Sequence, residues 1–242
     1  MSQSLGNIVK IMNCLSCGTN RFTEICQEVG LPRSTVHRLL SSMVDSGLSV
    51  QDPVSRLYYI GPVIFNLASN PTMAHQHLIV TAQNEIKWLN RVTQETIALH
   101  VLMGTYQICL DELVSSEPIK FMIGRGEMAL ACFGASGKML LSQLNDNELG
   151  HIKDKFDKLN KGSRTLSVFD EMSEIRKKGY AKSQGERKPG AAVYSMSVKN
   201  YYSPIALSVM GPENRIIEKE AIIIQSLKEA SERLSEQLKE QS

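Results

Sequence analysis

The sequence lacks any long apolar run. No segment of its 242 residues approaches the roughly 20 consecutive apolar residues that a helix needs to cross a bilayer. Residues 1–5 also lack the basic start and the apolar core of a signal peptide. These two absences argue against membrane insertion and against secretion, so we expect a cytoplasmic protein that does not contact membranes.

Cysteines are few and odd in number. Most of the five lie in apolar stripes, so we expect reduced thiols rather than a disulfide framework. Cys14 and Cys17 are spaced like half of a zinc site, and His75 and His77 form another isolated pair, but structural zinc sites have four ligands. We therefore expect no metal and no cofactor. The sequence alone does not decide whether Cys14 and Cys17 have a redox or metal role.

Residues 30–40 carry the pattern of a helix-turn-helix. Gly30 permits the positive φ of a tight turn, and Pro32 suits the first position of a helix. The 3.6-residue period turns Val36, Leu39 and Leu40 inward. The opposite face then carries four polar side chains, those of Ser34, His37, Arg38 and Ser41. Because these residue types can bond base edges and phosphates, this face suits the major groove of DNA.

The neighbouring segments complete a small winged domain. Apolar residues recur at helical spacing in residues 5–15 and 22–29, which predicts two helices before the turn, with Leu5 and Val9 in the buried stripe of the first. After Gly47, two short strands are predicted at 48–51 and 56–60, around turn-forming residues. Arg56 lies at this wing, where it can reach the phosphate backbone, and a surface hairpin without a ligand is an equal alternative.

These segments resemble the IclR family of bacterial transcriptional regulators, both at residues 31–40 and at the end of the wing, 59–61. Similar landmarks follow at 135–138, 179–186, 190 and 206–212. The resemblance implies an α+β protein with an N-terminal winged helix-turn-helix in residues 1–61 and a linker helix in 62–76. Residues 77–242 are then expected to form a C-terminal mixed α/β (GAF-like) effector-binding domain.

Charge gives little support for DNA binding by one copy of the chain. The sequence holds 27 Lys and Arg against 25 Asp and Glu, and residues 1–60 hold five cations against four carboxylates. Non-specific affinity grows with the number of phosphates neutralised, so a single such domain binds weakly and needs a second copy. The resemblance implies the same, because IclR-like regulators pair their winged domains on a palindromic operator as homodimers or homotetramers.

Helix and strand patterns alternate beyond residue 77. A long helix is predicted to begin there, with its inward stripe at Leu78, Ala82, Ile86, Leu89 and Val92. Strands are predicted at 96–103, 107–114, 119–123, 191–198 and 204–210, and helices at 136–144, 146–159, 167–178 and 213–241. These elements predict a sheet with helices packed on it.

Residues 134–138 are the strongest candidate for an enzymatic motif, and they complete none. A phosphate-binding loop needs a hydroxyl residue where Met139 stands, and a nucleophile elbow needs glycine where Lys138 stands. The histidines lie in no motif that would supply a base to Ser136. We therefore expect that the protein is not an enzyme.

The same segment suits a binding pocket, since free amides at Ser136 and Gly137 could hold a carboxylate, although an ordinary helix cap has the same sequence. The resemblance places an effector pocket at this segment and at the strands after Gly190 and before Gly211. The residues implied by motif position are Phe121, Ala129, Ala135, Ser136, Ser183, Val193, Ser208 and Met210. Ser183 and Met210 make this pocket less polar than in the family, which favours an aromatic or longer aliphatic acid.

The function predicted from these features is an effector-responsive, DNA-binding transcriptional repressor, switched by a small organic acid that binds as a carboxylate. Ser34, His37, Arg38 and Ser41 are predicted to face the groove of double-stranded DNA, and the backbone is predicted to be positioned by Arg33, Thr35 and Arg56. The alternative is a winged-helix module that binds DNA without an effector, or one that binds protein.

Overall fold

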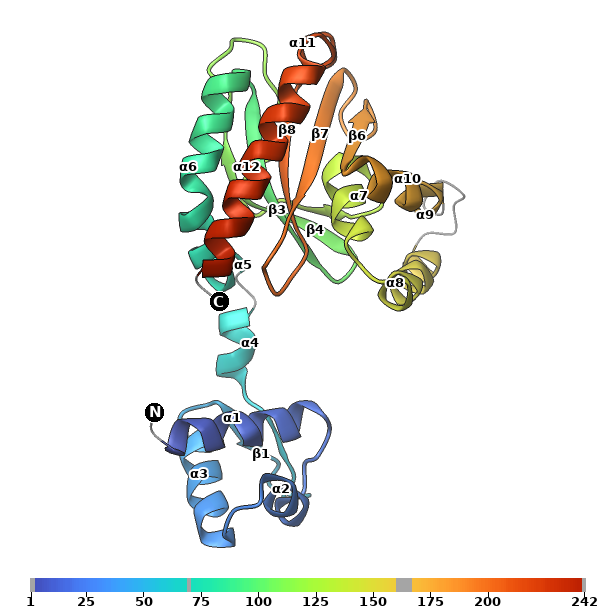
Figure 1. Ribbon diagram of the computed structural model, residues 1–242. Helices are drawn as coiled ribbons and strands as arrows, with labels where there is room; N and C mark the ends of the chain where they lie inside the picture. The colour runs from blue at the N-terminus through green and yellow to red at the C-terminus, as the bar shows by residue number, and fades with distance from the viewer. Residues whose placement is uncertain (1–2, 69–70, 160–166, 241–242) are drawn as a thin grey trace. The chain divides into compact units, whose positions relative to one another are not determined.

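The structure is a computed structural model that describes residues 3–68, 71–159 and 167–240. The chain forms two compact units, Met1–Ala74 and His75–Ser242, both shown in Figure 1. Each unit has its own apolar core, so each is described by itself. No helix within the described ranges is both long and apolar enough to cross a membrane.

The first unit is a three-helix core followed by a hairpin and two short helices. Its elements are α1 (Gln3–Ser16), α2 (Phe22–Val29), α3 (Arg33–Asp45), β1 (Ser49–Gln51), β2 (Tyr58–Ile60), α4 (Pro62–Ala68) and α5 (Pro71–Ala74). Strands β1 and β2 pair antiparallel. α2 ends at Gly30, whose φ of 69° lies in the left-handed region that the turn requires. The predicted winged helix-turn-helix is confirmed.

Helix α1 buries a different stripe from the one predicted. Ile11 is fully buried and Leu15 nearly so, whereas Leu5 is 65% exposed and Val9 is 50% exposed. The assignment of Leu5 and Val9 to the core is therefore wrong. More than one face of α1 is apolar, and only packing against the rest of the unit decides which face becomes buried.

The second unit is built on a six-stranded antiparallel sheet in the order β5-β4-β3-β8-β7-β6. The strands are β3 (Thr96–Met103), β4 (Tyr106–Leu113), β5 (Met128–Leu130), β6 (Tyr180–Gln184), β7 (Ala191–Val198) and β8 (Ile205–Pro212). Within β7 and β8, Val193 lies opposite Met210 and Ser195 lies opposite Ser208. These four side chains share one face of the sheet, because strand side chains alternate with a period of two.

Helices cover both faces of this sheet, as Figure 1 shows. One face packs against α6 (Gln76–Thr93), α11 (Glu213–Glu218) and α12 (Glu220–Glu240), with Leu207 and Val209 of β8 in the shared core. The other face packs against α7 (Gly134–Ser142), with α10 (Met172–Lys178) beside β6. Helices α8 (Asp146–Leu159) and α9 (Ser167–Asp170) contribute to the apolar core on that side. The predicted mixed α/β domain is confirmed.

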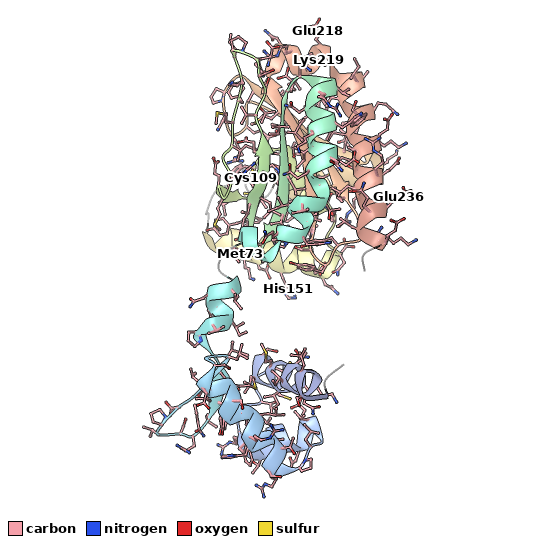
Figure 2. All side chains as sticks on the ribbon, turned by 90° about the vertical axis from the view of Figure 1, so that its left-hand side faces the viewer. Met73, Cys109, His151, Glu218, Lys219 and Glu236 are labelled. Atoms are coloured by element: carbon pink, nitrogen blue, oxygen red, sulfur yellow. The ribbon has the colours of Figure 1, made fainter. Side chains whose placement is uncertain are left out.

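A buried carboxylate joins α6 and β3 to the corner between α11 and α12. Glu95 is fully buried and accepts hydrogen bonds of 2.6 Å from both Nε and Nη2 of Arg215. Lys219, labelled at this corner in Figure 2, donates to the same carboxylate at 3.4 Å. These bonds satisfy a charge that would otherwise destabilise the core.

Several predicted elements of the second unit are wrong. Residues 119–123 form a loop, because their backbone bonds side chains instead of a neighbouring strand: Phe121 O accepts from Thr96 Oγ1, and Ile123 N donates to Glu112. Strands β5 and β6 were not predicted. The segments 167–178 and 213–241 were each expected to form one helix, and each forms two. Residue 241 lies outside the described residues. Val92 is 42% exposed rather than inward.

Candidate functional site

The outer face of α3 carries the polar side chains that the sequence assigns to DNA contact. Val36, Leu39 and Leu40 are buried in the core of the unit, which fixes the orientation of the helix. The opposite face is exposed at Arg33, Ser34, His37, Arg38 and Ser41, and Thr35 is half-buried. The six side chains therefore come from one helix, and five of them are open to solvent.

Phe22 contacts two of these side chains from α2. Its ring lies 5.8 Å from the guanidinium carbon of Arg33 and packs edge-on against His37, with ring centroids 6.1 Å apart. Such contacts restrict the directions that Arg33 and His37 can take. The sequence assigned Phe22 only to the core, because the periodicity of α2 does not reveal a neighbour on α3.

The tip of the wing is held by the Asp52 side chain. Its Oδ1 accepts hydrogen bonds from Ser55 N at 2.6 Å, Ser55 Oγ at 2.8 Å and Val54 N at 3.1 Å. The bonds from Ser55 hold the pKa of Asp52 below its ordinary value. Arg56 follows with a φ of 59° and an exposed side chain. The wing thus presents Arg56 on a hydrogen-bonded turn.

The second unit holds a cavity of about 30 Å³ at the start of α7. Five of the eight predicted effector-binding residues line it, namely Ala135, Ser136, Ser183, Val193 and Met210. The remaining wall includes Ile123, Glu186, Arg187 and Lys188, which the sequence did not indicate. Phe121, Ala129 and Ser208 are not in the lining. Phe121 lies on the loop beside Gly190. Ala129 of β5 pairs with Gln107 of β4, and Ser208 of β8 is fully buried.

The first amides of α7 are already hydrogen-bonded. Gly134 N donates to Glu186 Oε2 at 3.0 Å, and Ala135 N donates to Ser183 Oγ at 3.0 Å. Glu186 Oε1 also accepts from Lys138 Nζ at 2.7 Å. The helix begins at Gly134 rather than at Ser136, so its start differs from the predicted one. The protein's own side chains therefore bond the first two amides of this helix.

Glycine at position 137 lets α7 pack close to the backbone that precedes it. A Cβ at this position would lie 2.2 Å from the carbonyl oxygen of Ala131, which no real contact allows. This approach fixes Ser136, whose Oγ donates to Gln107 Oε1 at 2.6 Å. Gln107 Nε2 in turn donates to Phe133 O at 2.8 Å. Ser136 is thus bonded to an amide and not to a base that could activate it.

A buried polar row lies on the same face of the sheet. Ser195 Oγ and Ser208 Oγ are 3.0 Å apart, and Ser208 Oγ is 3.5 Å from His100 Nδ1. His100 is 1% exposed, and its Nε2 has no hydrogen-bond partner among the described residues. Burial and the nearby positive charge of Arg187 lower the pKa of His100 to about 3. The imidazole is therefore neutral at physiological pH.

The thiols and the metal-ligating residue types form no metal centre in the described ranges. No group of three or more His, Cys, Asp or Glu residues there is arranged to hold an ion. All five cysteines are free thiols, with Cys14 buried and Cys17 exposed. Burial raises the pKa of Cys109 to about 12 and that of Cys132 to about 11, so neither thiol is reactive at neutral pH.

An exposed polar recognition helix followed by a hairpin defines a winged helix-turn-helix protein of the DNA-binding kind, here joined to an α/β unit with a small cavity. The chain belongs to the IclR family of bacterial transcriptional regulators. The family's helix-turn-helix domain, "IclR helix-turn-helix domain", matches residues 4–53. "Bacterial transcriptional regulator IclR C-terminal" matches residues 71–236. The protein is thus a relative of DNA-binding transcriptional regulators and not of enzymes.

Individual relatives match most of the chain. The acetate operon repressor of Salmonella typhimurium is 28% identical over 251 residues, which cover 95% of this chain and 89% of the relative. The transcriptional repressor IclR of Escherichia coli is 25% identical over 246 residues, with coverages of 95% and 89%. A solved IclR-family regulator from Brucella abortus has a TM-score of 0.61, covers 98% of this chain and 92% of its own, and is 19% identical, which shows the fold alone.

Proposed function

We propose that this protein is a repressor that binds a palindromic DNA operator as a homodimer or homotetramer and is switched by a small organic acid bound in its second unit. The exposed polar face of α3 is the observation that carries the DNA-binding part. Two relatives of nearly equal length are named as repressors, which supports the direction of regulation. As a DNA-binding regulator, the protein is expected to act in the cytoplasm.

The proposed DNA contacts divide into two groups. We assign Ser34, His37, Arg38 and Ser41 to the major groove, because they share the exposed face of α3. We assign Arg33, Thr35 and Arg56 to the sugar-phosphate backbone, since Arg33 and Thr35 lie in the first turn of α3 and Arg56 lies at the wing. Only contacts of the first group carry base specificity.

Pairing of two copies is supported by what the first unit exposes. Its low net charge gives weak attraction for phosphates, so two copies bind much more tightly than one. Helix α1 exposes apolar surface at Leu5 and Val9. Helix α4 exposes it at Phe65, which is 66% exposed, and at Leu67, which is 59% exposed. Apolar surface of this kind is stabilised by a partner.

The effector part of the proposal rests on the cavity at α7. At about 30 Å³ it has room for one water-sized group, so an organic acid must displace side chains in order to bind. Met210 is the most adaptable of the lining side chains because its thioether is unbranched. An acid that binds one conformation of the unit better than another shifts the population of conformations, and with it the affinity for DNA.

The test begins with selection of bound sequences from a random duplex library, because no operator needs to be known in advance. The proposal predicts an inverted repeat, bound with a steep dependence on salt. Arg38→Ala should weaken binding to the selected site by about 1 to 3 kcal/mol and relax the preference for one base.

Lys10→Ala is the matched control, since Lys10 is an exposed cation of α1 outside the proposed contacts. It should leave the base preference unchanged. A selection that enriches no sequence, or an Arg38→Ala variant with the affinity and preference of the unaltered protein, contradicts the proposal.

A further inference from the structure

The first two amides of α7 are bonded to the chain's own side chains. The Glu186 carboxylate accepts from Gly134 N at 3.0 Å and from Lys138 Nζ at 2.7 Å. The Lys138 side chain is only 7% exposed and also bonds Glu171, so it is anchored at this position. Ala135 N is bonded to Ser183. A ligand carboxylate therefore finds neither of these two amides open, and other donors of the cavity come into question.

Two cations directly follow Glu186 and line the same cavity. Arg187 Nη2 donates to Glu127 Oε1 at 2.7 Å, which uses part of the donor capacity of the guanidinium. Lys188 Nζ donates to the carbonyl oxygen of Met122, a neutral acceptor. The negative charge of Glu186 is matched by Lys138 and that of Glu127 by Arg187. Among the described residues, Lys188 forms no ion pair with a carboxylate.

The positive charge of this pair extends into the unit. Arg187 contributes, after burial, to the lowered pKa of His100, which lies on the face of the sheet below α7. The lining between them is apolar at Ile123, Val193 and Met210. The lining of the cavity thus includes both cations and apolar side chains, a combination that suits an acid with an apolar body.

We propose that Arg187 and Lys188 form the carboxylate-binding subsite of the cavity, for a monocarboxylic acid with an apolar aromatic or aliphatic tail. Glu186 is then an internal carboxylate that keeps the α7 terminus filled, and the ligand carboxylate replaces the bond from Lys188 to Met122 O. The acid's tail contacts Ile123, Val193 and Met210. This inference rests on the proposed effector function and names the groups that recognise the effector's charge.

The test compares acids with their neutral amides on the full chain: benzoate with benzamide, and hexanoate with hexanamide. Thermal-shift and calorimetric titrations should show binding of at least one acid and no binding of its amide. Lys188→Gln and Arg187→Gln should each weaken binding of that acid by at least about tenfold, because a charge-assisted hydrogen bond is lost. Arg187→Lys should restore part of the affinity.

Lys182→Gln is the matched control. Lys182 is an exposed cation of β6, adjacent to Ser183 and outside the cavity lining, so its loss should not change acid binding. The melting temperature of each variant without ligand shows whether the unit remains folded. Equal binding of acid by the unaltered protein and by both cavity variants overturns the subsite.

DNA binding, measured separately on the selected operator, distinguishes failure of the proposed subsite from failure of the proposed function. If an acid binds and changes DNA affinity but its amide binds equally well, the subsite is wrong and the proposed function stands. If no acid of the panel binds while DNA binding persists, both the subsite and the effector half of the proposed function are overturned, and an effector-independent repressor remains.

Discussion

The two units use polar side chains in opposite ways. In the first unit, Ser34, His37 and Arg38 are exposed on α3, and the core beneath them is formed by other residues. In the second unit, Ser136 and Ser183 are buried, and their hydroxyl groups bond neighbouring elements. The first arrangement separates function from stability, whereas the second makes the candidate ligand-binding residues part of the fold.

This difference has an energetic consequence. Substitutions of exposed residues usually change the free energy of unfolding by less than about 0.5 kcal/mol, whereas loss of one partner of a buried polar pair costs about 1 to 3 kcal/mol. The exposed residues of α3 that we propose as DNA contacts can therefore change at little cost in stability. The second unit cannot change its cavity as freely.

The largest effect is expected at Glu95, the buried carboxylate of the second unit. Glu95→Ala leaves Arg215 without the two 2.6 Å hydrogen bonds that hold it and opens space in a packed corner. Breaking a buried ion pair by removing one partner costs about 3 to 5 kcal/mol. Urea unfolding followed by fluorescence of Trp88, the chain's only tryptophan, reports on this unit.

Glu218→Ala provides the control, because Glu218 lies at the same corner but is exposed (Figure 2). It should leave the urea midpoint unchanged. If Glu95→Ala unfolds at the urea concentration of the unaltered protein, the buried charges do not stabilise the unit and the contrast between the units fails.

The next effect concerns the stability of the second unit at acidic pH. The pKa of His100 is about 3 in the folded protein, against about 6.5 in an unfolded chain, so the unfolded state takes up a proton that the folded state refuses. Stability therefore falls as the pH drops below 6.5, by about 2 kcal/mol between pH 7 and pH 5 for this residue. His100→Asn should remove that part of the pH dependence.

This pH dependence is tested by free energies of unfolding at pH 7 and pH 5, measured for the unaltered protein and for His100→Asn. His151→Asn serves as control, since His151 is exposed on α8, and it should keep the full pH dependence. Parallel pH profiles for the unaltered protein and His100→Asn would show that His100 does not titrate as its burial requires.

A smaller effect, opposite in sign for stability and function, is expected at the wing. Arg56 has a left-handed φ of 59°, which costs a non-glycine residue energy. Arg56→Gly should raise stability by about 1 kcal/mol or less and lower DNA affinity, with the slope of log affinity against log salt reduced by about 1. An unchanged salt slope would remove Arg56 from the phosphate contacts.

The smallest effect is on thiol chemistry. Cys17 is exposed, whereas burial raises the pKa of Cys109 and of Cys132 above the neutral range. An aromatic disulfide reagent should modify Cys17 of the folded protein without changing the melting temperature of the second unit, and should reach Cys109 only after unfolding. Mass spectrometry of the modified peptides checks the order, and early labelling of Cys109 would contradict it.

Prediction from sequence succeeded where the information is local. The turn at Gly30, the polar face of α3 and the strands β3 and β7 follow from residue types and spacing within one segment. It failed where partners lie far away in the chain. Nothing near residue 120 shows that its backbone bonds Thr96 and Glu112, and the apolar spacing of α1 does not show which stripe α2 and α3 cover.

The cavity shows the same limit. Five lining residues follow from the family resemblance, but Ile123, Glu186, Arg187 and Lys188 come from loops whose approach to α7 depends on the whole sheet. The bond from Gly134 N to Glu186 spans 52 residues, so no local pattern could indicate that the helix terminus is filled. Residues that act through distant contacts need the structure.

The central claim is that one chain couples an acid in the α7 cavity to DNA contacts on α3. Fluorescence anisotropy of the selected operator, titrated with protein in the absence and in the presence of a saturating acid, tests it directly. We predict that the acid changes the dissociation constant by at least about fivefold, the lower end of typical coupling between sites. Equal dissociation constants, with the acid shown to be bound, would contradict the account.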